Sequence, residues 1–209
     1  MKTPWMEMTV REFQAALASS SPTPGGGTAA AIALGQASAL TIMVCDLTIG
    51  KEKWQEGWNV AEEALTSSVR IMTRAGELAD EDSDAFDAVM DSFKLPKDSD
   101  EDKDARRNAI RNATLVATEI PHETAKLALD LLRHLPDLAS KGNANAVSDV
   151  GVAGLLASAA CKGALFNVDI NIGSLPEDMA VGIRASAPEI LEESRKLSRE
   201  IMDLVKDRI

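Results

Sequence analysis

The sequence has few of the residues that bind metals or form disulfides. Its 209 residues include two histidines, His122 and His134, and two cysteines, Cys45 and Cys161. Neither histidine has a partner at the spacing of metal ligands, so we expect no metal site. Both cysteines lie in apolar helical stretches, which indicates structural thiols in a reduced, cytoplasmic protein. The start, MKTPWMEM, has no apolar core of a secretion signal.

The sequence also lacks the glycine-rich loops that bind nucleotide phosphates. Its glycine cluster, Gly25–Gly27, fits neither GxxxxGK[ST] nor GxGxxG, and no strand pattern precedes it. The net charge of −11 argues against nucleic acid or an anionic membrane as a partner. Residues 77–104 hold twelve acids and three lysines, and therefore −9 of that charge. The rest of the chain is nearly neutral.

We expect the fold to be arranged around the segment from Pro22 to Lys53. The sequence PTPGGG ends whatever precedes it, and a run rich in alanine, glycine and serine continues to Gly50, a suitable helix exit. Such small residues let other helices approach closely, so we predict a long, central, buried helix. Its first NH groups and the flexible glycines suit an anionic or polar ligand; alternatively, the turn serves packing alone.

The same segment raises the question of a membrane span. No residue from Ser19 to Cys45 is charged, which is long enough to cross a bilayer. The run opens with PTPGGG, however, and carries Gln36, Ser38 and Thr41 among mostly alanine. We therefore expect no membrane partner.

The rest of the chain reads as further helices. Thr9 and Glu12 form a capping box for a short lid or docking helix, and helical periodicity runs over 55–93 and again over 104–135, where Pro121 should kink or break the helix. Residues 167–173 are β-like in composition but too few to require a sheet. About six helices without a convincing strand pair predict one all-α bundle over residues 1–209.

One carboxylate lies in line with predicted core residues. The apolar stripe of the 55–93 helix runs Ile71, Ala75, Leu78, Asp82, Phe86, Val89 and Phe93. The acids Asp80, Asp84, Asp87 and Asp91 form a separate stripe, which we expect to be solvated. For Asp82, desolvation and nearby carboxylates would raise the pKa toward the range useful for proton transfer. The alternative is a buried aspartate paired with a structural partner.

A polar turn, GNANAVSD, precedes another helix of small residues. The side chains of Asn143, Asn145, Ser148 and Asp149 gather at that helix's N-terminus. They could cap the helix, or they could hydrogen-bond a heterocycle.

Six motifs of the chain resemble those of the cyclodeaminase/cyclohydrolase family, which acts on one-carbon tetrahydrofolates. In chain order they are Ser21–Gly27 (SPTPGGG), Met43–Lys53 (MVCDLTIGKEK), Asp82–Met90 (DSDAFDAVM), Leu95–Lys97 (LPK), Gly142–Gly151 (GNANAVSDVG) and Asn167–Asn171 (NVDIN). The resemblance implies an all-α homodimer, a folate cleft between helices, and an aspartate ahead of Ala-Phe as the acid/base. That position is Asp82, which the periodicity singles out independently.

The sequence and the resemblance together predict the substrate contacts and the reaction. We expect folate to be bound by Pro24, Gly25, Gly26, Gly27, Lys51, Asn143, Asn145, Ser148 and Asp149, with Lys51, a cation that follows the central helix, on the anionic glutamate tail or the pterin edge. The expected reaction is hydrolysis of 5,10-methenyltetrahydrofolate to 10-formyltetrahydrofolate, with no metal or redox cofactor. Cyclodeamination of 5-formiminotetrahydrofolate is the alternative, although the chain holds no transferase domain to supply that compound. A non-catalytic folate-binding dimer is the second alternative.

Overall fold

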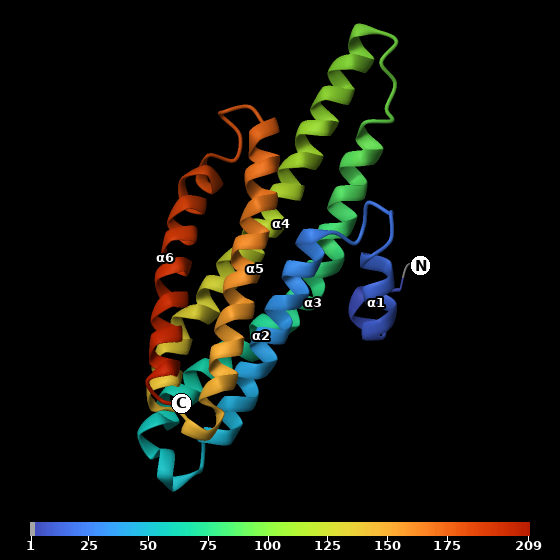
Figure 1. The fold of residues 1–209 in the computed structure, drawn as a ribbon. Coiled ribbons are helices and arrows are strands. Elements are labelled where there is room, and N and C mark those ends of the chain that lie inside the picture. Colours follow the sequence, from blue (N-terminus) through green and yellow to red (C-terminus); the bar gives the residue numbers. More distant parts are fainter. Residues whose placement is uncertain (1–2) are drawn as a thin grey trace.

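The chain folds into a bundle of α-helices joined by short turns (Figure 1). A computed structural model describes residues 3–209, and that range contains no strand. The six helices are α1 (Val10–Leu17), α2 (Gly26–Thr48), α3 (Trp58–Ser92), α4 (Asp100–Lys141), α5 (Val147–Ser174) and α6 (Val181–Lys206). The all-α prediction is confirmed.

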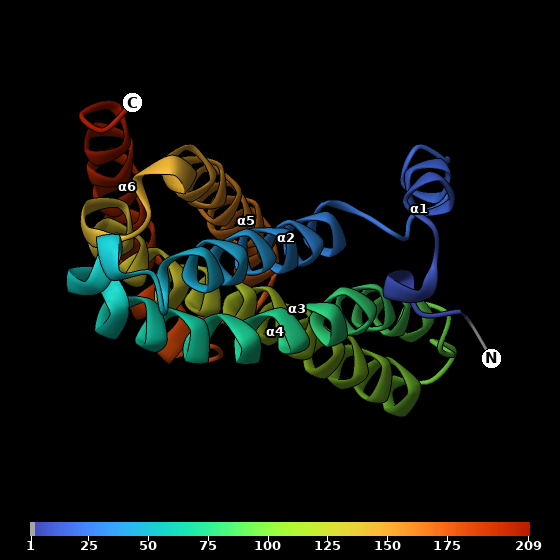
Figure 2. The same ribbon diagram turned by 90° about the horizontal axis from the view of Figure 1, so that it is seen from below.

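The central helix α2 packs between α3 and α5, and α5 packs against α4 and α6 (Figures 1 and 2). Leu34, Ala37 and Val44 on the inner side of α2 are completely buried. On its outer side, Met43 and Leu47 are 38% and 42% exposed. The small residues thus bring α3 and α5 close to one side of α2 and leave an apolar outer face.

Two segments have the length and apolarity of a membrane span, α2 and residues 144–174. In each, 56% of the apolar window is buried inside the bundle. A core helix of a globular protein has the same properties, so these two helices are weak evidence for a membrane protein.

The apolar stripe of α3 is buried along only part of its length. Ile71, Ala75 and Leu78 are fully buried, whereas Phe86 and Phe93 are 41% and 49% exposed. The last turns of α3 run past the end of α2 together with α4 (Figure 1), so fewer helices are there to cover them. The expectation of a core stripe is right up to Asp82 and wrong beyond it.

Pro121 does not break α4, which continues through it to Lys141. A proline has no N–H, so the carbonyl of Ala117, four residues earlier, loses its helical donor. The side-chain amide Nδ2 of Asn171, on α5, donates to that carbonyl at 2.8 Å. The hydrogen bond that the proline removes is replaced by one between α5 and α4.

Residues 167–173 are the last turns of α5 and not extended chain. Val168 faces the core, and the Asn167 side chain donates to the carbonyl of Gly163 one turn back. The β-like composition was therefore misleading, because packing against the bundle outweighs local preference here.

Both cysteines are buried and unpaired, as expected of structural thiols. Burial, with a contribution from Asp46, raises the pKa of the Cys45 thiol to about 12. A thiol with this pKa is inert as a nucleophile at neutral pH.

Candidate active site

A cavity of about 300 Å³ lies at the N-terminal end of α2, where α3, α4 and α5 also meet. It is lined by Pro22, Thr23, Gly25, Gly26, Gly27, Asp82, Phe86, Val89, Ala117, Asn167, Ile170 and Asn171. Three glycines and the aspartate that the sequence singled out therefore share one cavity. Pro24 is buried directly beside them in the chain.

The Asp82 carboxylate bridges α3 and the first turn of α2. Its Oδ2 accepts a hydrogen bond from Thr28 Oγ1 at 3.0 Å. Burial raises the pKa of Asp82 above its ordinary value, and hydrogen bonds from the side chain and backbone of Thr28 partly oppose that rise. The direction agrees with the expectation from the sequence, but the cause is burial and not neighbouring carboxylates.

The glycine at position 27 makes this contact possible. A Cβ there would overlap the Oδ1 atom of Asp82, whereas one at Gly26 would meet nothing within 4 Å. The N-cap of α2 is Gly25, which has no side chain to satisfy the first NH groups. The Asp82 carboxylate partly fills that role from α3, in the position where a helix dipole favours negative charge.

The acids around Asp82 are less solvated than expected. Asp80 accepts a hydrogen bond from the backbone N–H of Trp5 at 2.9 Å, and Asp87 accepts one from Thr23 Oγ1 at 3.4 Å. Asp91 is exposed and pairs with Lys94. The expectation of four solvated acids is therefore wrong for Asp80 and Asp87, which hold the segment that precedes α2.

Two asparagines complete the polar lining and were not among the predicted site residues. Asn167 and Asn171 each use Nδ2 to donate to a backbone carbonyl. This fixes both amides and leaves each side-chain oxygen as the available acceptor. The sequence held two signals for them: both asparagines belong to the NVDIN motif, and an interior proline such as Pro121 predicts a carbonyl that needs another donor.

The other predicted substrate contacts lie at the opposite end of α2. Asn143 donates from its backbone N–H to Thr48 Oγ1 at 3.0 Å and from Nδ2 to the carbonyl of Leu47 at 2.8 Å. Its Oδ1 accepts the backbone N–H of Asn145. Lys51, Ser148 and Asp149 belong to the same end of the bundle. Because α2 has 23 residues, these groups are roughly 30 Å from Asp82 within one chain.

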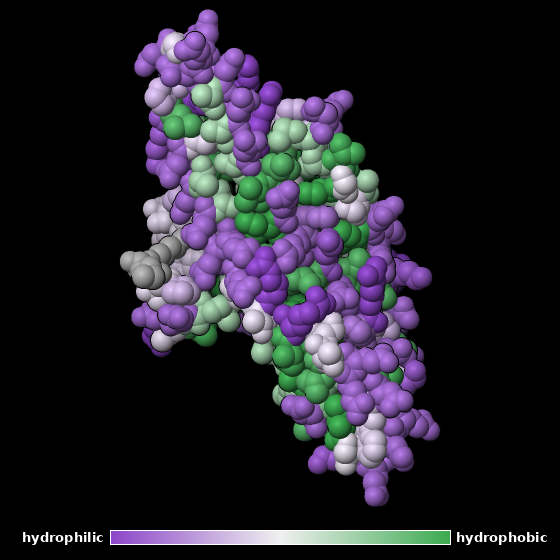
Figure 3. Space-filling model, turned by 180° about the vertical axis from the view of Figure 1, so that it is seen from behind, coloured by the Kyte–Doolittle hydropathy of each residue, from purple (hydrophilic) through white to green (hydrophobic). Residues whose placement is uncertain are grey.

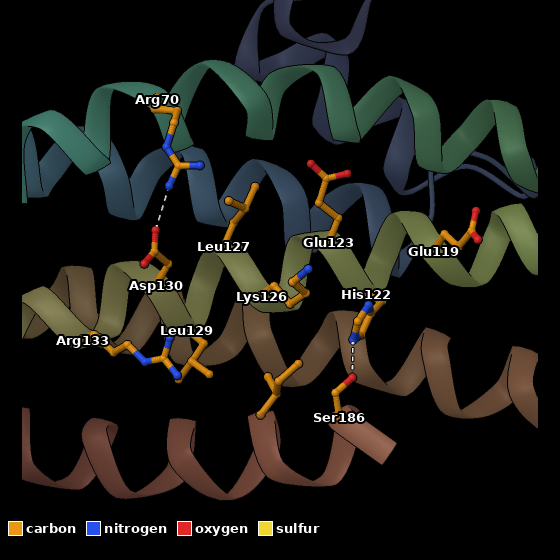
Figure 4. Close-up of a pocket in the computed structure, with 11 residues that line it drawn as sticks. Arg70, Glu119, His122, Glu123, Lys126, Leu127, Leu129, Asp130, Arg133 and Ser186 are labelled. Carbon is orange, nitrogen blue, oxygen red and sulfur yellow. Dashed lines mark hydrogen bonds and ion pairs between the residues drawn. The ribbon is translucent and has the colours of Figure 1, made fainter. Parts of the chain in front are cut away.

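A larger groove, of about 790 Å³, is lined by α3, α4 and α6 (Figure 4). Its charged groups largely neutralise one another, as in the Arg70–Asp130 ion pair. His122 bonds the hydroxyl of Ser186, and burial together with Lys126 lowers its pKa. Size alone favours this groove, but it holds no carboxylate with a raised pKa, so we take the smaller cavity as the site.

Comparison with known proteins agrees with this fold. The sequence profile described as Formiminotransferase-cyclodeaminase matches residues 9–187. The methenyltetrahydrofolate cyclohydrolase of Methylorubrum extorquens is 39% identical over 96% of this chain and 97% of its own length. The formimidoyltransferase-cyclodeaminase of Gallus gallus is 29% identical over 94% of this chain, which spans only 36% of that longer protein.

A solved structure shares the fold. The formiminotetrahydrofolate cyclodeaminase of Thermotoga maritima superimposes with a TM-score of 0.80 at 27% identity, over 97% of this chain and 96% of that one. Sequence profile, nearly full-length relative and solved structure agree, and the chain belongs to the formiminotransferase-cyclodeaminase family.

Proposed function

We propose that the chain is a methenyltetrahydrofolate cyclohydrolase, which adds water to 5,10-methenyltetrahydrofolate and forms 10-formyltetrahydrofolate. The observation that carries this proposal is the Asp82 carboxylate, held in a small cavity with a pKa raised by burial. The choice among family activities rests on the Methylorubrum extorquens cyclohydrolase, which matches over nearly the full length of both chains.

Asp82 can carry both proton transfers of this hydrolysis. As a carboxylate it takes a proton from water while the water oxygen bonds to the carbon between N5 and N10. The C–N5 bond then breaks, N5 receives that proton, and the new hydroxyl releases its own proton to solvent as the formyl C=O forms. A carboxyl group whose pKa is raised suits both steps, and such catalysis typically contributes about 10²- to 10⁴-fold in rate.

Cyclodeamination is the second candidate, because the Thermotoga maritima neighbour is described as a cyclodeaminase. There N10 bonds to the formimino carbon and gives its proton to the carboxylate. The departing nitrogen takes that proton and one more from solvent, and ammonia leaves. The same aspartate serves both reactions, so the identity of the nucleophile distinguishes them.

We further propose that the enzyme works in the cytoplasm without a metal or redox cofactor. Neither reaction changes the oxidation state of the transferred carbon, so only protons, water or ammonia need to move. The two buried thiols fit a reducing compartment.

We propose that the enzyme is a homodimer that pairs the α2–α5 faces of two chains. Outward-facing apolar side chains on these two helices are Met43, Leu47, Val152, Leu155, Phe166 and Ile170. On the opposite side of the molecule, polar side chains predominate (Figure 3). A face two helices wide and about 33 Å long measures roughly 700 Å², close to the ~800 Å² per partner of a typical stable interface.

A two-fold axis across this face would unite the two halves of the predicted site. Helices α2 and α5 run antiparallel, since Thr48 meets Asn143 at one end and the cavity joins Gly27 to Asn167 at the other. The axis would place the Lys51 end of one copy over the Asp82 end of its partner. Among residues 3–209, the cavity lining contains a carboxylate and no cation, although folate carries an anionic glutamate tail. Lys51 of a second copy would supply the missing charge.

The proposed reaction predicts a preference between two substrates. We expect purified protein to hydrolyse 5,10-methenyltetrahydrofolate, followed by the loss of its near-ultraviolet absorbance, with a higher kcat/KM than it shows for ammonia release from 5-formiminotetrahydrofolate. A higher kcat/KM for 5-formiminotetrahydrofolate would refute the cyclohydrolase proposal in favour of the cyclodeaminase. Inactivity on both substrates would favour a non-catalytic folate-binding dimer.

Replacing Asp82 should separate catalysis from stability. We expect Asp82→Asn to lower kcat about 10²- to 10⁴-fold, because a carboxamide cannot carry the proton. The raised pKa means that the stability contributed by Asp82 is present at low pH and is lost as the pH rises through its folded-state pKa. We therefore expect the variant to have a higher Tm than wild type at pH 8, with a gap that narrows toward pH 4.

The control for this experiment is Asp84→Asn, an exposed acid two residues along the same helix. We expect it to leave kcat unchanged. Near-wild-type turnover by Asp82→Asn would refute the assignment of Asp82 as the acid/base.

The glycines should differ in which kinetic constant they affect. We expect Gly27→Ala to lower kcat at least tenfold, because its Cβ displaces the Asp82 carboxylate. Gly26→Val should mainly raise KM, because its side chain would enter the cavity. Gly35→Ala, on the same helix with only an ordinary contact to Ala75, is the control. Equal kinetics for Gly27→Ala and Gly35→Ala would contradict the proposed contact.

The shared site predicts complementation between two defective subunits. We expect Lys51→Ala and Asp82→Asn homodimers to be poorly active at substrate concentrations below KM. A mixed dimer would join one intact Asp82 to the other copy's intact Lys51, so co-expression and tandem purification through two different tags should restore about half of the wild-type activity. Activity no greater than that of the separate variants would place Lys51 outside the partner's site.

A further inference from the structure

A chain of hydrogen bonds leads from the N-terminal segment to the candidate catalytic carboxylate. Trp5, in a 3-10 turn before α1, donates from Nε1 to Ser83 Oγ at 3.0 Å. The hydroxyls of Ser83 and Thr28 are 3.0 Å apart, and Thr28 Oγ1 is 3.0 Å from Asp82 Oδ2. Trp5 is 6% exposed, and both hydroxyl residues are completely buried.

The hydrogen bonds in this series all point the same way, because Trp5 stands at one end and the Asp82 carboxylate at the other. An indole N–H can only donate, and a carboxylate can only accept. Ser83 therefore accepts from Trp5 and gives its own proton to Thr28, which in turn donates to Asp82. Each hydroxyl proton is directed toward the carboxylate, and aligned donors of this kind strengthen one another in a water-excluded interior.

We propose that Trp5, Ser83 and Thr28 are positioning residues of the candidate active site, which hold Oδ2 of Asp82 and leave Oδ1 for the reacting water and the folate nitrogen. This inference rests on the proposed function and deepens it. Because Trp5 cannot accept a proton, the hydrogen bonds from Trp5 to Asp82 cannot all reverse direction. When Asp82 is protonated, its proton is therefore on Oδ1, the oxygen beside Gly27.

The same tryptophan anchors the N-terminal segment. Its backbone N–H donates to Asp80 Oδ1 at 2.9 Å, and its ring meets Phe13 of α1 edge-on, with the ring centroids 6.1 Å apart. Helix α1 has no buried residue and stands beside the bundle (Figure 2). Docking of this segment and orientation of Asp82 thus both involve Trp5. In this way two residues far from Asp82 in the sequence, Thr28 and Trp5, take part in the site.

The test is a graded series of variants in the full chain. Thr28→Val removes the donor to Asp82, Ser83→Ala removes the middle hydroxyl, and Trp5→Phe removes the indole N–H while keeping an aromatic ring. Each change destabilises the carboxylate, so the acidic limb of the kcat–pH profile should move to higher pH. We expect about 1 to 2 pH units for Thr28→Val, less for Ser83→Ala and least for Trp5→Phe, with KM within about twofold.

Two controls separate positioning from packing. Ser68→Ala makes the same change at another fully buried position of α3, where the hydroxyl has no hydrogen-bond partner, and should leave the profile unchanged. Thr28→Ser keeps the hydroxyl and should restore the wild-type profile. A series in which Ser83→Ala and Trp5→Phe shift the profile no more than Ser68→Ala would overturn the proposal.

A measurement that needs no turnover separates this inference from the proposed function. Carbon-13 NMR of labelled aspartate, assigned through Asp82→Asn, reports the pKa of Asp82 in the protein without substrate. We expect the same order of upward shifts across the series. If the pKa of Asp82 shifts but the protein is inactive on both folates, the proposed reaction is refuted and the positioning role stands. If the enzyme is active but the pKa of Asp82 does not shift, the positioning role is refuted and the proposed reaction stands.

Discussion

The contact between the Asp82 carboxylate and the first turn of α2 is the constraint on which the candidate site depends. Gly27 leaves room for Oδ1, Thr28 bonds Oδ2, and Gly25 provides no side-chain cap of its own. Two long helices are therefore held in register at the point where α2 begins. The carboxylate is stabilised by oriented donors and destabilised by burial, and burial has the larger effect, so the pKa of Asp82 is raised.

Small residues on α2 determine how closely the neighbouring helices pack around the contact between Asp82 and α2. Alanines, glycines and hydroxyl residues on the inner side of α2 let α3 and α5 approach it closely, and the same composition leaves Asp46, in the last turn, as the one charged residue of the helix. One sequence property thus provides a rigid support for Asp82 and an apolar face suited to a second copy. The proposed catalytic geometry and the proposed dimer therefore both depend on this helix.

Much of the fold was predictable because it depends on local patterns. Periodicity, capping residues and breakers located most helices, and the register of Asp82 with Leu78 and Ala75 marked the aspartate that the fold then partly buries. Contacts between distant residues carried no such signal: nothing near Trp5 indicates Ser83, and nothing near Asn171 indicates Ala117. Periodicity shows which face of α3 is apolar but not how far a neighbour covers it, which is why Phe86 was misplaced. The motifs also gave no sign that Asp82, on α3, packs beside the N-terminal end of α2, whereas Lys51 follows its C-terminal end.

Pro121 has a consequence for how such a site can change over time. By removing one N–H, it frees the Ala117 carbonyl that orients Asn171, although the proline is not among the residues that line the cavity. Any other amino acid at 121 would restore the helical donor, and the Ala117 carbonyl would then be shared between two donors, which weakens its hold on the Asn171 amide. A change in the wall of the bundle would in this way reach a side chain of the cavity without touching the cavity itself.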